Sequence, residues 1–126
     1  DNLLFGEPGS DDEVVVYDWQ LATRAMGALD LGRLVGGSEL VAERRLHPMD
    51  ALNCWHETLL TQGVKNYHHA QALDDFRIAA VANLGIPVRL HCLANDSTER
   101  FSQLVDVMAE RLFASAIDVE AWKALD

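Results

Sequence analysis

The sequence predicts an α+β fold in which a short β-hairpin is followed by a mainly α-helical bundle. Two short apolar runs, residues 3–5 and 14–17, flank a segment dense in Gly, Pro, Ser and Asp, which is typical of a reversing loop. Apolar residues then recur at helical spacing through the rest of the chain, with glycine and proline as the interruptions.

The composition describes one acidic domain, or a part of a larger one. The chain has 126 residues, of which 49% are hydrophobic, so a packed core is expected. Its 10 basic and 20 acidic residues give a net charge of −10. This balance argues against nucleic acid and anionic membrane as partners, because both attract clustered Lys and Arg. No apolar run reaches the roughly 18 residues of a membrane span, and we expect a cytoplasmic location.

A carboxylate directly follows the second apolar run. Val14–Val16 are three consecutive β-branched residues, which favour a buried strand, and Asp18 comes where the run stops. Burying that charge is costly unless it is paired or bound to a cation. In a hairpin, Asn2 at the start of the first strand would face Asp18 at the end of the second. The two side chains are therefore candidate ligands of a metal ion.

The rest of the chain predicts helices separated by glycine and proline. Residues 19–26 are expected to form a loop, and the apolar stretch 78–84 to be buried on several sides. We expect Pro87 to end or kink the helix before it. The expected helical segments are 31–35, 40–46, 49–62, 73–86, a stripe over 101–112, and 119–125. The first is expected to end at Gly36–Gly37. The expected starts are Asp30 for the first segment, Asp96 or Ser97 for the helix with the 101–112 stripe, and Asp118 for the last.

The order of these motifs resembles the C-terminal lobe of the aminoglycoside-phosphotransferase and choline-kinase-like superfamily. The resemblance rests on Asp1–Phe5, the turn, Val14–Gln20 and Gly27–Leu31. The Asp-Trp-Gln variant is similar to the ecdysteroid-kinase-like and related bacterial phosphotransferase branch, and residues 55–60, 63–64, 67 and 74–79 also fit it.

The resemblance implies a fold, a division of the chain and an activity. It implies a partial protein-kinase-like domain over residues 1–126, with a metal-binding hairpin over 1–20 and a helical part over 28–126. The activity implied is Mg²⁺-dependent transfer of a phosphoryl group from ATP to the hydroxyl of a small-molecule alcohol. The expected cofactors are therefore Mg²⁺ and ATP.

The resemblance also implies roles for individual residues. Asn2 closes a catalytic loop of the form His-Gly-Asp-x-x-x-x-Asn and holds magnesium, and Asp18 holds magnesium on the nucleotide phosphates. The catalytic base is expected upstream of Asp1. We therefore expect a fragment that lacks its N-terminal lobe, contains no catalytic residue and is inactive alone. Trp19 and Gln20 are expected to fix Asp18.

Three further residues are candidate substrate contacts, and one is a candidate support. Tyr67, Asp74 and Asp75 suit a cationic or polyhydroxylated acceptor, although a solvated acidic helix start is the alternative for the two aspartates. Asp30 is expected to satisfy free N–H groups at a helix start and to tie down the loop after Asp18.

Two other interpretations remain open at this point. The first is a zinc site formed by Cys54, His56, His68–His69 and His91–Cys92. The spacing of these residues matches no standard zinc pattern. We expect instead a packed Cys54 and an exposed His56 on one helix. The rival to the kinase hypothesis is a non-catalytic helical interaction domain, including a degenerate kinase relative.

Overall fold

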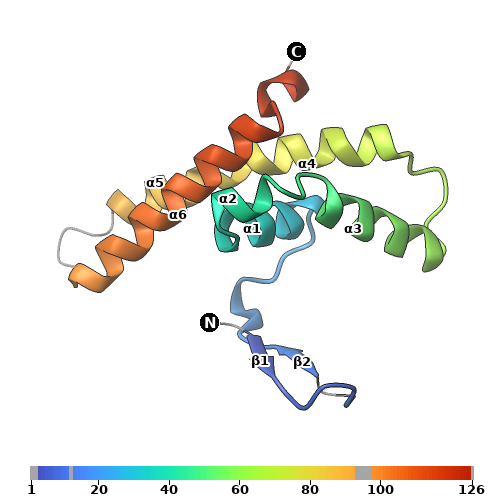
Figure 1. Ribbon diagram of the computed structural model, residues 1–126, viewed down its shortest axis with the longest axis horizontal. Coiled ribbons are helices and arrows are strands. Elements are labelled where there is room, and N and C mark those ends of the chain that lie inside the picture. The colour runs from blue at the N-terminus through green and yellow to red at the C-terminus, as the bar shows by residue number, and fades with distance from the viewer. Residues whose placement is uncertain (1–2, 12, 93–97, 126) are drawn as a thin grey trace.

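A computed structural model describes residues 3–11, 13–92 and 98–125 as a two-stranded hairpin followed by a helical body (Figure 1). This confirms the predicted α+β class, with helix dominating. In chain order the elements are β1 (Leu3–Phe5), β2 (Val14–Val16), the 3₁₀ helix η1 (Trp19–Leu21), α1 (Ala28–Ser38), α2 (Val41–Arg44), α3 (Asp50–Thr61), α4 (His69–Asn83), α5 (Gly85–Cys92), α6 (Glu99–Asp118) and the 3₁₀ helix η3 (Ala121–Ala124).

The hairpin is antiparallel and stands away from the helices (Figure 1). Leu3 pairs with Val16 and Phe5 with Val14, and the turn between the strands includes Gly9 at a φ of +80°. The expectation of a buried strand is wrong. Exposure runs from 38% at Val15 to 76% at Phe5, because no helix of the described chain covers either face of the strands.

Helix α4 lies at the centre of the helical body and contacts α1, α3, α5, α6 and η3. The main core contains Val35, Leu52, Ala72 and Phe76, which come from α1, α3 and α4. A second cluster joins α4 to the C-terminal end of the chain through small side chains, namely Ala80, Ala116 and Ala121. The long helices are therefore held together by one aliphatic and aromatic core and by close alanine contacts.

Helix α1 begins earlier and ends later than expected. It starts at Ala28, before Asp30, and continues through Gly36 and Gly37 to Ser38. A Cβ on Gly36 would lie 3.1 Å from Leu112 Cδ2. The glycine thus permits the close approach of α1 and α6, and this packing offsets the intrinsic cost of glycine in a helix.

The break between α4 and α5 also differs from the prediction. Helix α4 starts at His69 rather than at residue 73 and ends at Asn83, and α5 starts at Gly85. Pro87 is the third residue of α5, where a missing N–H group is tolerated. Ile78 is 41% exposed, so the stretch 78–84 is buried on one side only.

The last long helix has a different cap from those expected. The cap of α6 is Thr98, whose hydroxyl accepts a hydrogen bond from the Phe101 N–H at 3.3 Å, and Asp96 and Ser97 lie outside the described residues. Asp118 is the last residue of α6 and not the cap of a following helix. No helix in the described ranges has the length and apolar character needed to cross a membrane.

Candidate functional site

Asp18 lies two residues after the end of β2 and adopts a left-handed backbone conformation, with φ 62° and ψ 59°. A positive φ is uncommon outside glycine, and aspartate is among the residues that tolerate it best. Such conformations cost free energy and concentrate at functional sites. The backbone geometry therefore marks Asp18 as the residue where the chain turns sharply out of the sheet.

Two neighbouring side chains make short-range contacts around Asp18. The Trp19 indole N–H donates to the carbonyl oxygen of Val16 at 3.0 Å, and the Gln20 amide donates to Asp18 Oδ2 at 3.4 Å. The Trp19 side chain is nevertheless 67% exposed. The turn after β2 is thus held by local hydrogen bonds and not by packing against a core.

A cavity of about 390 Å³ lies between this turn and the first turns of α1. Asp18 lines it from the hairpin side, and Asp30 and Arg33 line it from α1. Two carboxylates and one guanidinium group therefore share a space between the end of β2 and the start of α1. Arg33 was not predicted, although its spacing of three residues from Asp30 places the two on one helical face.

Asn2 lies outside the described residues. The pairing of Leu3 with Val16 shows that the start of β1 and the end of β2 lie at the same end of the hairpin. Asp18 is therefore the one described residue of the expected pair of magnesium ligands.

The donors at the Asp18 cavity are suited to magnesium. Mg²⁺ takes oxygen ligands and is usually held by one or two carboxylates together with phosphates and water, and not by an all-protein cage. Asp18 and Asp30 supply carboxylate oxygens to one cavity. Within the described ranges no three His, Cys, Asp or Glu side chains form a metal-binding cluster, which is the arrangement that zinc would need.

Asp30 lies in the first turn of α1, but Gly27 occupies the cap position and no side chain caps the helix there. The Asp30 carboxylate makes no hydrogen bond to another described residue. Its position next to the positive end of the helix dipole is favourable for a carboxylate. Asp30 therefore faces the cavity without the capping contact that the sequence led us to expect.

The candidate substrate residues, Tyr67 just before α4 and Asp74 and Asp75 on it, divide into two environments. The Tyr67 hydroxyl donates to Asp75 Oδ2 at 2.6 Å, and burial together with this carboxylate raises the pKa of Tyr67 well above its ordinary value. Asp74 is exposed and pairs instead with Arg77 on its own helix at 3.1 Å. None of the three candidates lines the Asp18 cavity.

The expected burial of Cys54 and exposure of His56 are both wrong. Cys54 is exposed, whereas His56 is 7% exposed, and its Nε2 lies 2.9 Å from the carbonyl oxygen of Tyr67. His56 follows Leu52 by four residues, so the two share the buried face of α3. That spacing was the signal that could have identified His56 as a buried residue.

Comparison with protein-family models, with curated proteins and with solved structures finds no match to this chain.

Proposed function

We propose that this chain forms the metal- and nucleotide-binding half of a Mg²⁺-dependent phosphotransferase that phosphorylates a hydroxyl group of a small molecule. The observation that carries the proposal is the position of Asp18. It lies just after the β-hairpin, has a left-handed backbone conformation and lines a cavity together with Asp30. The order of the hairpin, the acid at its end and the following helix supports it.

In this proposal Asp18 and Asn2 hold magnesium on the phosphates of ATP. Phosphoryl transfer depends mainly on positioning and on neutralising charge, with little covalent chemistry from the protein. Asp18 supplies a carboxylate that is accessible from the cavity, and Arg33 adds a guanidinium group suited to a phosphate oxygen. The cavity thus contains donors for both the metal and the nucleotide.

The proposal requires residues beyond those of the chain. The aspartate that accepts the proton of the substrate hydroxyl would lie five residues before Asn2, and a further lobe would cover the nucleotide. Tyr67 and Asp75 contact each other, so a substrate at that position would have to displace or bridge an existing hydrogen bond.

Turnover of ATP by the protein that carries this chain tests the proposal. Asp18→Ala should abolish phosphoryl transfer and leave the helical body folded, because Asp18 lies outside both core clusters. Asp11→Ala, which removes an exposed carboxylate from the same hairpin, is the matched control and should retain activity. Full activity of the Asp18 variant would refute the proposal.

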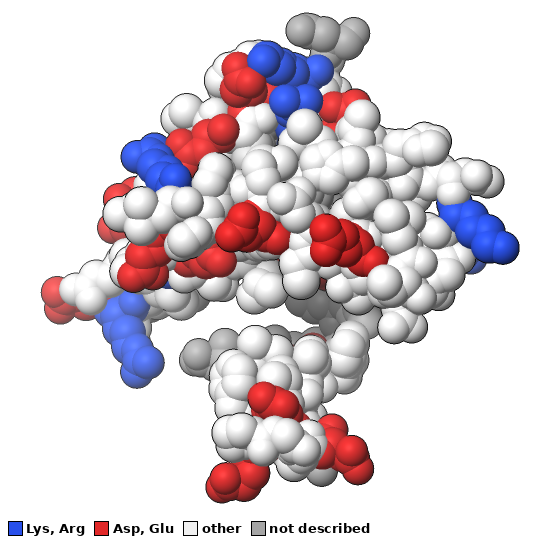
Figure 2. Space-filling model, turned by 45° about the vertical axis from the view of Figure 1, so that its right-hand side comes forward, with Lys and Arg blue, Asp and Glu red and all other residues white. Residues whose placement is uncertain are grey.

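One observation favours the alternative of a non-catalytic interaction domain. Both faces of the hairpin are apolar and exposed, and the charges that Figure 2 shows on it are acidic. Residues 1–23 contain no Lys or Arg. A partner with an apolar surface edged by basic residues would complement this hairpin. Binding of such a partner with no magnesium dependence and no ATP turnover would favour the alternative.

A further inference from the structure

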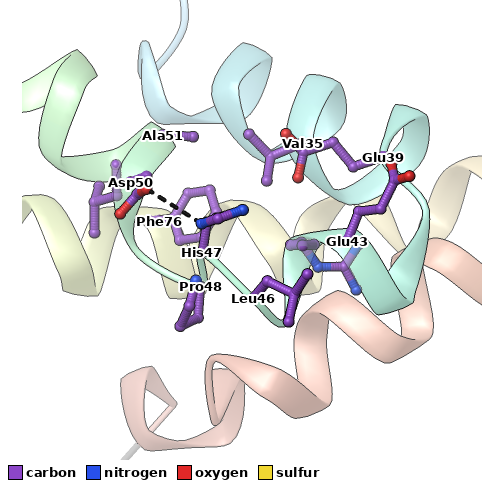
Figure 3. A pocket seen from close by; sticks show the side chains of 11 residues that line it. Val35, Glu39, Glu43, Leu46, His47, Pro48, Asp50, Ala51 and Phe76 are labelled. Atoms are coloured by element: carbon purple, nitrogen blue, oxygen red, sulfur yellow. Dashed lines mark ion pairs between the residues drawn. The ribbon is translucent and has the colours of Figure 1, made fainter.

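A second cavity, of about 450 Å³, lies beyond the C-terminal half of α1 (Figure 3). Val35 of α1 and Phe76 of α4 form part of its apolar wall, and the segment from residue 43 to residue 52 supplies most of the remainder. Its volume falls within the range of small-molecule sites in proteins. The Asp18 cavity adjoins the other end of α1, so the two sites are separate and this inference does not depend on the proposed function.

Arg44 lines this cavity and is only 5% exposed. Its Nη2 donates to the carbonyl oxygen of Arg111 at 3.4 Å and to Asp118 Oδ2 at 3.3 Å. Its Nε and Nη1 are buried and have no hydrogen-bond partner in the described chain. Buried N–H groups of native proteins are rarely left without an acceptor, so these two donors point to an oxygen-bearing ligand.

Arg44 shares its carboxylate partner with a second arginine. Arg45 pairs with the same carboxylate, Asp118, at 3.0 Å, so two guanidinium groups share one acid. Arg111 donates to the carbonyl oxygen of Ser38 at 2.7 Å, so a third guanidinium group uses a backbone acceptor. A ligand carboxylate would supply a further acceptor for Arg44.

The rim of the cavity carries acidic side chains. Glu39 and Glu43 lie next to each other at one end of it in Figure 3, and neither makes an ion pair with another described residue. At the other end His47 Nδ1 lies 3.7 Å from Asp50 Oδ2. The two free carboxylates favour a cation, and the buried guanidinium favours an anion.

We propose that this cavity binds a small zwitterion, an amino acid or ω-amino acid. The ligand carboxylate lies against the Arg44 guanidinium group, and the ligand ammonium group lies against Glu39 and Glu43. The apolar wall at Val35 and Phe76 accommodates the methylene groups between the two charged ends.

A series of ω-amino acids from glycine to 6-aminohexanoate tests the proposal, with binding followed by amide chemical shifts in NMR spectra of residues 1–126. At least one member should bind and shift the amides of residues 39–50. Hexanoate and hexylamine, which each keep one charge, should bind roughly tenfold more weakly than the matching zwitterion. Absence of binding across the series, or equal binding of the single-charge compounds, would overturn the proposal.

Substitutions inside and outside the cavity test whether the zwitterion binds there. Glu43→Gln should weaken the zwitterion roughly tenfold and leave hexanoate binding unchanged. Glu57→Gln removes an exposed carboxylate of α3 outside the cavity and should change neither affinity. Arg44→Lys should weaken zwitterion and hexanoate alike. An unchanged affinity in Glu43→Gln, or an equal loss in Glu57→Gln, would contradict the assignment even if the Arg44 variant does not fold.

Discussion

At the scale of single residues, Tyr67 has the most strongly altered chemistry. Its ring packs edge-on against Trp55 at a centroid distance of 6.0 Å, and its hydroxyl donates to Asp75 at 2.6 Å. Burial is the main reason that the pKa of Tyr67 is raised, and the hydrogen bond to Asp75 is the second. Both causes favour the protonated phenol in the folded state.

This shift predicts a loss of stability in alkali. Because the folded-state pKa lies above the unfolded value of about 10, the contribution of Tyr67 is complete below pH 10 and is lost as the pH rises through the folded pKa. Urea unfolding should show a steeper fall in stability above about pH 10 for the wild type than for Tyr67→Phe. Tyr17→Phe, the control, should keep the steep fall. Identical pH profiles for wild type and Tyr67→Phe would contradict the assignment.

The sequence predicted part of the residue-scale picture. The position of Asp18 at the end of a strand follows from the β-branched run before it. Its left-handed backbone and the cavity shared with Asp30 depend on the path of the connecting loop, which local propensity does not determine. His56 shows the same limit, because a polar residue on the buried face of a helix needs a partner that only the folded chain supplies.

At the scale of elements, α1 packs closely against α4 and α6 because Gly32 and Gly36 carry no side chain. A Cβ on Gly32 would lie 3.1 Å from Ala79 Cβ and 3.4 Å from the backbone of the same residue. Asn83 strengthens the contact between α1 and α4, since its side-chain amide donates to the carbonyl oxygen of Leu29 at 3.1 Å. Gly37, five residues further along α1, has no atom within 4 Å of the position of a Cβ.

Alanine substitutions at Gly37 and at Gly32 are expected to have opposite effects on stability. Gly37→Ala should raise stability by about 0.5–1 kcal/mol, because alanine restricts the unfolded chain and fits a helix. Gly32→Ala should lower it by about 1–3 kcal/mol, because Ala79 can move away only with its backbone. Urea unfolding of both variants measures the difference. An equal gain in stability from both would show that α1 and α4 are not packed as described.

These contacts explain why the helix boundaries differ from those expected. Local signals ended α1 at the glycines, but tertiary packing against α6 carries the helix through them. The chain leaves α4 at Leu84, ahead of Pro87, so the proline lies in the first turn of a new helix and does not end the old one. Periodicity predicted the long helices α1, α3, α4 and α6, but not α5 or the 3₁₀ helix η1, where a loop was expected. The ends of the helices required knowledge of what they contact.

At the scale of the whole molecule, charged groups connect α2 to the end of α6. Asp118 accepts from Arg44 at 3.3 Å and pairs with Arg45 at 3.0 Å. The Asp118 side chain is 19% exposed and that of Arg44 is 5% exposed, so solvent screens their interaction only weakly. The pair fixes the short helix α2 over the second cavity.

Removal of Asp118 should therefore be strongly destabilising. Asp118→Ala leaves the buried Arg44 charge uncompensated and is expected to lower the free energy of unfolding by about 3 kcal/mol. Asp106→Ala, at an exposed position of the same helix, should change it by less than about 0.5 kcal/mol. Chemical denaturation of both variants makes the comparison. Similar small effects would mean that Arg44 does not depend on Asp118.

The arrangement of hairpin and helices could not be predicted from the sequence. Two short apolar runs and the turn residues between them predict the two strands, but not whether anything covers them. In the described structure the hairpin is exposed on both faces and joins the helical body through the loop that lines the Asp18 cavity (Figure 1).

Calorimetric titration of the protein that carries this chain with ATP, with and without Mg²⁺, tests the central claim most directly. The wild type should bind ATP more tightly with Mg²⁺, and Asp18→Asn should reduce that gain roughly tenfold or more, because it removes the carboxylate charge at nearly constant shape. Asp11→Asn should retain the wild-type response. ATP binding that is unaffected by both Mg²⁺ and the Asp18 substitution would contradict the account.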